Sequence, residues 1–213
     1  MHIELENVLP GDIEKRSMEI IASELPHPIA EENADVIKRV IHTSADFDYA
    51  DTLCFSPDVC AKTAELLQKG GVTIVTDTKM AFSGVNKAAC EKLGVEVACY
   101  ISDEDVAQAA KANGTTRATA SMDKAAALSG PVIFAIGNAP TALVRLYELM
   151  EEGKLSPALI IGVPVGFVNV VQSKELILAS KAPYIVARGR KGGSNVAAAI
   201  CNALLYRATG RKL

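Results

Sequence analysis

The sequence contains no tryptophan, and aromatic residues make up only 5% of its 213 residues. Aliphatic side chains must therefore fill the core, and hydrophobic residues amount to 49% of the chain, which is enough for a substantial core. Small aliphatic side chains favour helices that pack closely on a parallel sheet. The scarcity of aromatic rings also leaves little to stack on a flavin or a nucleotide base.

Long hydrophobic runs are missing as well. No apolar segment approaches the ~20 residues needed to span a bilayer, and the first 17 residues have no apolar stretch typical of a signal peptide. The five cysteines include no CxxC pair and are odd in number, which favours free thiols in a reducing compartment over disulfides. We therefore expect a cytoplasmic protein that does not insert into a membrane.

No strongly basic character is present, because the formal net charge is -3. A nucleic-acid-binding protein usually shows a basic face, so we expect no nucleic-acid partner. The late part of the chain does contain a local group of basic residues: Arg188, Arg190, Lys191, Arg207, Arg211 and Lys212. A small anionic ligand suits such a group better than DNA does.

Five short apolar runs dominate the rest of the chain, and amphipathic or alanine-rich segments separate them. They are residues 72–77, 95–101, 131–137, 158–163 and 183–189. Strands without alternation, separated by helices, predict a parallel sheet that is buried on both faces. We therefore predict an α/β protein, a three-layer α/β/α sandwich with a five-stranded parallel sheet in the order 2-1-3-4-5.

The length suits one domain, 1–213. Residues 1–60 precede the first predicted strand and contain two predicted helices within 11–42, so they are expected to form an N-terminal helical extension outside the sheet. Residues 61–213 would form the doubly wound core. Ligands of such folds bind beyond the carboxyl ends of the strands.

One strand-end loop, 189–195, has a composition suited to anions. Lys191, Gly192, Gly193 and Ser194 stand at the start of an alanine-rich predicted helix, where free N–H groups and the helix dipole attract negative charge. The segment matches neither GxxxxGK[ST] nor GxGxxG, so a nucleotide is not supported. A plain glycine turn with a helix cap is the alternative.

His42 is the main candidate for acid–base chemistry. It falls near the end of the second predicted helix, where the dipole favours a protonated imidazole by ~0.3–1 kcal/mol, and Asp46 and Asp48 are close enough in sequence to orient it. Arg39 stands three residues earlier, on the same side of a helix, where it could hold a carboxylate. A capping histidine and a surface arginine are the alternatives.

Other candidates are weaker. Arg16 and Ser17 stand in the first predicted helix, where a cap or salt bridge is the default. Asp77 follows the first predicted strand, but no histidine or carboxylate stands at metal-ligand spacing, so we expect no metal site. No GxSxG motif suggests a hydrolytic nucleophile.

Together, several segments resemble one family, and the resemblance covers nearly the whole chain. They are EKRSMEIIASE (14–24), VIKRVIHTSADFDYAD (36–51), FSPDVCAKTAELLQKGGVTIVTDTKM (55–80), IGNAPTAL (136–143), GVPVGFVN (162–169) and GGSNVAAAICNALL (192–205). In this order and spacing they resemble the precorrin-8X methylmutases, including the cobalt-precorrin-8 branch.

The resemblance implies a flavodoxin-like fold, a homodimer and an isomerase of cobalamin biosynthesis. The implied reaction moves a methyl group from C-11 to C-12 of a corrinoid precursor, giving hydrogenobyrinate or cobyrinate, with no redox cofactor or added metal. It places the catalytic role on His42 and substrate binding on Ser17 and Arg39. Whether the substrate already carries cobalt stays open. A non-catalytic binding module of the same fold is the alternative function, and a flavin or nucleotide enzyme is a third.

Overall fold

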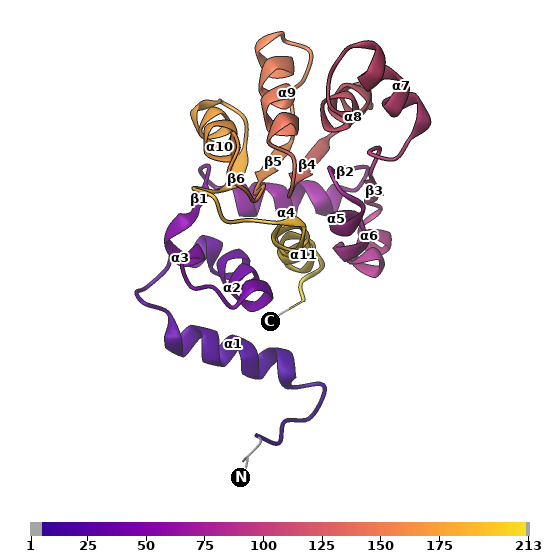
Figure 1. Ribbon diagram of the computed structural model, residues 1–213. Coiled ribbons are helices and arrows are strands. Elements are labelled where there is room, and N and C mark those ends of the chain that lie inside the picture. The colour runs from indigo at the N-terminus through magenta and orange to yellow at the C-terminus, as the bar shows by residue number, and fades with distance from the viewer. Residues whose placement is uncertain (1–5, 212–213) are drawn as a thin grey trace.

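A single mixed sheet forms the centre of the molecule (Figure 1), which is a computed structural model that describes residues 6–211. Its strands are β1 (Leu53–Phe55), β2 (Thr73–Thr76), β3 (Glu96–Ala98), β4 (Val132–Ile136), β5 (Leu159–Gly162) and β6 (Tyr184–Ala187). Their order across the sheet is β1-β6-β5-β4-β2-β3.

The five strands from β2 to β6 coincide with the five apolar runs, and all of them pair in parallel. Their order confirms the predicted 2-1-3-4-5 arrangement. Alternate residues of β4 enter two separate cores: Ile133 and Ala135 on one face, and Phe134 and Ile136 on the other. Because both faces are buried, the strands carry no polar alternation in the sequence.

The prediction of five strands, with residues 1–60 outside the sheet, was wrong because the sheet has a sixth strand at one edge. Strand β1 lies within the first 60 residues and pairs antiparallel with β6, with Leu53 opposite Ala187 and Phe55 opposite Ile185. A strand of three residues is too short to show a hydrophobic period, so the sequence gave no signal for it.

Helices cover both faces, which confirms the layered α/β/α arrangement (Figure 1). On one face lie α8 (Arg117–Ala126), α9 (Pro140–Glu151) and α10 (Val170–Ala179), with α7 (Glu104–Ala112) against α8. On the other face lie α4 (Val59–Lys69), α5 (Lys79–Gly84), α6 (Lys87–Leu93) and α11 (Ser194–Thr209).

The N-terminal elements form a further layer outside α11. They are α1 (Ile13–Glu24), the short 3-10 helix η1 (Glu31–Asn33), α2 (Ala34–Ser44) and α3 (Tyr49–Thr52). Helix α2 packs on α11, and α1 packs on α2, as Figure 1 shows. Helix α11 thus lies between the sheet and α2, which explains why its sequence is apolar on nearly every side. None of the helices between residues 6 and 211 is long and apolar enough to cross a membrane.

Candidate active site

His42 and Ser17 meet in one pocket between the N-terminal helices. The pocket has a volume of about 330 Å³. Its lining comprises Ser17, Ile20, Ile21, Glu24, Ile41, His42, Ala45 and Phe47. The structure therefore brings together the histidine and the serine that were predicted from sequence.

The end of α2 explains how His42 reaches this pocket. Ala45 ends the helix in a left-handed conformation (φ 52°), and its N–H bonds to the carbonyl of Ile41. His42 is exposed in the last turn, where unpaired carbonyl groups favour a positive charge. Ser17 donates its hydroxyl hydrogen to the carbonyl oxygen of Ile13 at 2.8 Å, so its oxygen lone pairs stay available to accept.

Arg39 occupies a different position from the one expected of an open clamp. It is only 8% exposed and does not line the pocket. One terminal nitrogen donates to Oε1 of Glu14 at 2.5 Å, and the guanidinium lies 5.1 Å from the ring centroid of Tyr206. Its Nε is buried without a hydrogen-bond partner, so the guanidinium keeps one unused donor.

Glu14 pairs with two arginines, Arg39 and Arg211. Burial of Glu14 opposes its ionisation, but the hydrogen bond from Arg39, followed by the charges of Arg39 and Arg211, lowers the pKa of this carboxyl below its usual value. Arg211 donates to the second oxygen of Glu14 at 2.7 Å. The carboxylate is therefore shared between the two guanidinium groups.

Lys191 reaches the same region from the strand-end loop. Its ammonium lies 2.6 Å from carboxylate oxygens of both Asp46 and Asp48, just after α2. The hydrogen bonds to these two aspartates raise the pKa of Lys191, and the bond to Lys191 lowers the pKa of Asp46. Asp46 and Asp48 were expected to orient His42, but within residues 6–211 no hydrogen bond joins either of them to His42, and both bind Lys191. They tie the 189–193 loop to the segment beside the pocket.

The connection from that loop to α11 leaves little room for side chains; it consists of Gly192, Gly193 and Ser194. A Cβ on Gly192 would lie 2.1 Å from the carbonyl oxygen of Val163, so only glycine fits there. The N–H of Gly193 donates to the same oxygen at 2.8 Å. The hydroxyl of Ser194, the first residue of α11, is hydrogen-bonded to the Thr78 hydroxyl at 2.8 Å. The loop thus meets the carboxyl ends of β2 and β5.

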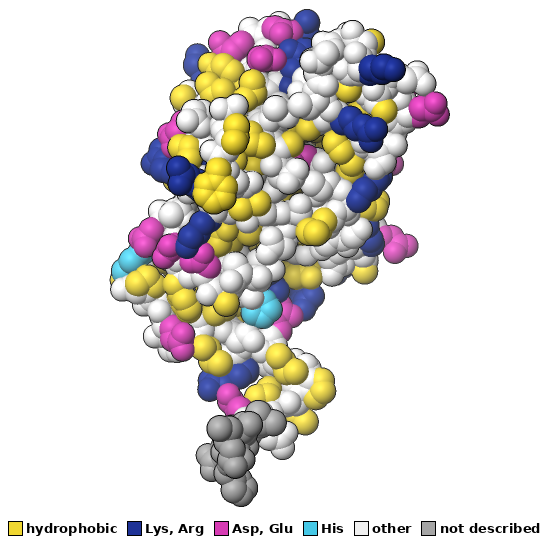
Figure 2. All heavy atoms as spheres, viewed as in Figure 1, with side chains coloured by type: hydrophobic (Ala, Val, Ile, Leu, Met, Phe, Trp, Pro, Cys, Tyr) yellow, Lys and Arg dark blue, Asp and Glu magenta, His cyan; other side chains and the backbone are white. Residues whose placement is uncertain are grey.

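Most of the remaining basic candidates lie in ion pairs or outside the described residues, and Arg190 instead lies over the ring of Phe167, 5.4 Å from its centroid. Arg16 is exposed and pairs with Glu6 at 2.6 Å, away from the pocket lining. Arg188 pairs with Glu175 at 3.0 Å, and Arg207 pairs with Asp35. Lys212 falls outside residues 6–211. Figure 2 accordingly shows acidic and basic side chains intermixed on the visible face.

Asp77 has a structural role at the end of β2. Its carboxylate accepts backbone N–H groups of Gly137, Asn138 and Ala139 at 2.9, 2.8 and 2.7 Å. Burial raises the pKa of Asp77, and these three donors oppose that rise. Within residues 6–211 no cluster of three or more histidine, cysteine or acidic residues could hold a metal ion.

Comparison with known proteins identifies the family. Residues 12–207 match the family described as precorrin-8X methylmutase. The chain belongs to that family. A cobalt-precorrin-8 methylmutase of Priestia megaterium is 46% identical, covering 92% of this chain and 88% of the relative. Another from Salmonella typhimurium is 49% identical over 80% of each chain. The crystal structure of a precorrin-8X methylmutase from Thermus thermophilus matches with a TM-score of 0.83 and 34% identity, covering 94% of this chain and all of that one.

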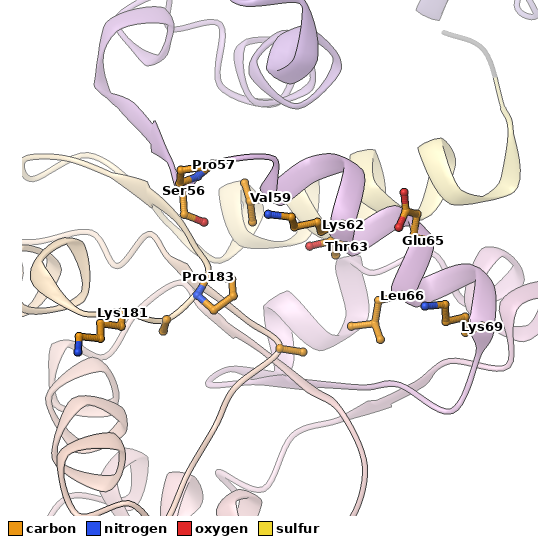
Figure 3. Close-up of a pocket in the computed structure, with 12 residues that line it drawn as sticks. Ser56, Pro57, Val59, Lys62, Thr63, Glu65, Leu66, Lys69, Lys181 and Pro183 are labelled. Atoms are coloured by element: carbon orange, nitrogen blue, oxygen red, sulfur yellow. The ribbon is translucent and has the colours of Figure 1, made fainter.

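A larger cavity of about 520 Å³ lies at the other end of the sheet (Figure 3). Its lining includes Ala158 and Pro183, which directly precede β5 and β6, and Leu66 of α4. Neither His42 nor Ser17 lines this cavity. Doubly wound folds bind ligands at the carboxyl ends of their strands, and the loop after β6 reaches Asp46 and Asp48, beside the His42 pocket, through Lys191. The His42 pocket is therefore the candidate active site despite its smaller size.

Sequence reasoning missed two residues that hold candidate site residues or their loop in place. Glu14 holds Arg39, which only the packing of α1 on α2 makes evident. Lys174 of α10 is fully buried and donates to the carbonyl oxygens of Gly189 and Lys191. Because Lys174 stands among Gln172, Ser173 and Glu175, nothing in the sequence signals that it is buried.

Proposed function

We propose that this protein is an isomerase of cobalamin (corrin) biosynthesis that moves a methyl group from C-11 to C-12 of precorrin-8 or its cobalt form. The product would be hydrogenobyrinate or cobyrinate. The family match over residues 12–207 carries this proposal. The pocket that joins His42 to Ser17 supports it, because it offers an acid–base group beside a hydrogen-bond acceptor.

His42 would act as the acid of the reaction. A 1,5-sigmatropic methyl shift is unimolecular, so the enzyme has to bind, orient and adjust the protonation of the macrocycle. An unperturbed histidine titrates near pH 6.5 and can hold or release a proton near neutrality. A proton delivered to the conjugated ring would draw electrons from the migrating centre.

The acetate and propionate arms of the substrate would bind to the surrounding polar groups. Ser17 of α1 lines the pocket. Arg39 precedes His42 by three residues on α2 and keeps an unused Nε donor. Lys191 ties the 191–194 loop to Asp46, which follows the pocket residue Ala45. Arg16 would contribute from the exposed side of α1 by giving up its pairing with Glu6. Lys191 would share its charge between Asp46, Asp48 and a substrate carboxylate.

The names of two relatives specify the substrate further: those from Priestia megaterium and Salmonella typhimurium are both cobalt-precorrin-8 methylmutases. We propose that this protein accepts the cobalt-containing form. We further propose that residues 1–213 form one methylmutase domain that acts in the cytoplasm as a homodimer, with no cofactor. Five free cysteines support the reducing compartment.

The direct test is turnover by the purified protein. Incubation with precorrin-8 and with cobalt-precorrin-8, followed by visible absorption spectroscopy and mass spectrometry, should show an isomer of unchanged mass with a corrin spectrum. Binding of the corrin product without any turnover of either substrate would support the alternative, a non-catalytic tetrapyrrole-binding module. If the protein neither binds the corrin product nor turns over either substrate, both the isomerase and the binding-module proposals are refuted.

A further inference from the structure

Lys174 is a fully buried lysine in α10 that the reaction described above does not use. Its Nζ donates to the carbonyl oxygens of Gly189 and Lys191, each at 2.8 Å. Burial of an ammonium group is costly unless other groups compensate. Both of these compensating acceptors belong to the loop that follows β6.

Three successive backbone carbonyl groups of this loop accept hydrogen bonds from neighbouring segments. Lys174 binds those of Gly189 and Lys191, and the N–H of Gly166 donates to that of Arg190 at 3.2 Å. While these carbonyl groups are bonded, the Lys191 side chain of the same loop reaches Asp46 and Asp48 beside the His42 pocket. Lys174 therefore binds the backbone of a loop whose Lys191 side chain contacts the proposed site.

We propose that Lys174 is a positioning residue for substrate binding, which fixes the 189–193 loop so that Lys191 and the start of α11 are held beside the His42 pocket. This inference rests on the proposed function, in which that loop binds substrate carboxylates. Lys174 does not touch the substrate and acts only through the loop.

If Lys174 only stabilised the fold, its replacement would lower the melting temperature. Burial lowers the pKa of Lys174 to about 8, because removing the ammonium group from water costs free energy in the folded state. Methionine has a similar length and no charge, and replacing a buried ion by an apolar residue is often neutral or stabilising. Lys174→Met should therefore release the loop without lowering the melting temperature. Stability and positioning can then be measured separately.

The test compares Lys174→Met with the wild type by hydrogen–deuterium exchange of the 186–196 segment and by steady-state kinetics. We expect faster exchange in this segment, and a KM for the precorrin substrate raised about 10- to 100-fold, the range for losing a hydrogen bond to a charged group. The kcat should stay within a few-fold. Lys174→Gln, whose amide has two N–H donors, should recover part of the KM. Lys181→Met, an exposed lysine after the same helix, is the matched control.

The outcomes separate this inference from the proposed function. Unchanged exchange in both variants would refute positioning by Lys174. Faster exchange with an unchanged KM would also refute it, because the loop would then not bind substrate, while wild-type turnover would leave the isomerase assignment standing. If Lys174→Met does not fold, the same two measurements on Lys174→Gln decide. An inactive wild-type protein would instead refute the proposed function.

Discussion

Arg39 carries a buried positive charge whose partners limit what it can do in the site. Glu14 occupies one terminal nitrogen at 2.5 Å, and the ring of Tyr206 lies beside the guanidinium. The buried Nε is the donor left over, and buried donors normally find a partner. A substrate carboxylate is a partner of the right charge. Because Nε is covered and Arg39 does not line the pocket, the groups that cover Nε would have to move before a carboxylate could bind there.

Replacing Arg39 by alanine should weaken binding of the corrin product by roughly 1.5–3 kcal/mol, the range for hydrogen bonds to charged groups. Isothermal titration with hydrogenobyrinate measures this change. Glu14 keeps its bond to Arg211 in the variant, which limits the damage to the fold. Lys38→Ala, on the same helix, is the control. An unchanged affinity in Arg39→Ala would remove Arg39 from the binding site.

His42→Asn tests the acid directly, because asparagine has a similar size and hydrogen-bonding capacity but cannot supply a proton. We expect turnover to fall by ~10²–10⁴-fold, the usual contribution of general acid catalysis, while product affinity is retained. His27→Asn is the control, since His27 contacts Asp51 at 2.7 Å outside the pocket lining. Turnover within a few-fold of wild type would leave His42 with a binding or structural role only.

Lys174 should also make stability depend on pH. Its folded-state pKa of about 8 lies below the ordinary value of 10.5, so between these pH values the unfolded chain holds a proton that the folded chain does not. Stability should then rise with pH across this window. Other groups titrate there too, so the difference between wild type and Lys174→Met in urea unfolding isolates the effect. A difference that is constant from pH 7 to 10.5 would contradict it.

At the scale of elements, Asp77 shows how one side chain organises a strand-end turn. Its carboxylate binds three successive N–H groups where the chain leaves β4 and enters α9. Nests of this kind bind anions in other proteins, and here the anion belongs to the chain itself. This arrangement agrees with the absence of a nucleotide-binding motif in the sequence.

Asp77→Ala should therefore leave three inward-facing N–H groups without their acceptor. We expect the free energy of unfolding to fall by roughly 3 kcal/mol or more, given the cost of unmade hydrogen bonds to a charged group. Asp77→Asn keeps one acceptor oxygen and should lose less. Urea denaturation of both variants measures this. A loss under about 1 kcal/mol for Asp77→Ala would mean that water replaces the carboxylate.

The five parallel strands could be predicted because burial on both faces leaves uninterrupted apolar runs. Strand β1 could not, because its pairing with β6 depends on distant residues and spans three positions. The same distinction holds in the site. His42 was selected from its position near a helix end and Ser17 from the family resemblance, whereas the bonds of Arg39 to Glu14 and of Lys191 to Asp46 join residues 25 and 145 positions apart. Sequence spacing alone does not specify such contacts.

At the scale of the whole molecule, exposed hydrophobic residues gather near the carboxyl ends of the strands. Phe167 and Val168, in the loop between β5 and α10, are 82% and 78% exposed, and Met80 at the start of α5 is 71% exposed. Large apolar side chains in such a position often mark an interaction surface. A second subunit would remove them from water and help to enclose a wide macrocycle.

We therefore expect a homodimer whose interface includes Phe167. Phe167→Ser should raise the dissociation constant of the dimer, because burying a phenylalanine side chain contributes about 1.5–3 kcal/mol, and both subunits of a symmetric dimer lose the contact. Sedimentation velocity from nanomolar to micromolar concentration, without substrate, measures the shift and separates subunit contacts from substrate contacts. Leu9→Ser changes another exposed hydrophobic residue, which lies before α1 and is 71% exposed, and should leave the assembly unchanged. A wild-type monomer at micromolar concentration would refute the dimer, and a wild-type dimer unaffected by Phe167→Ser would place the interface on another face.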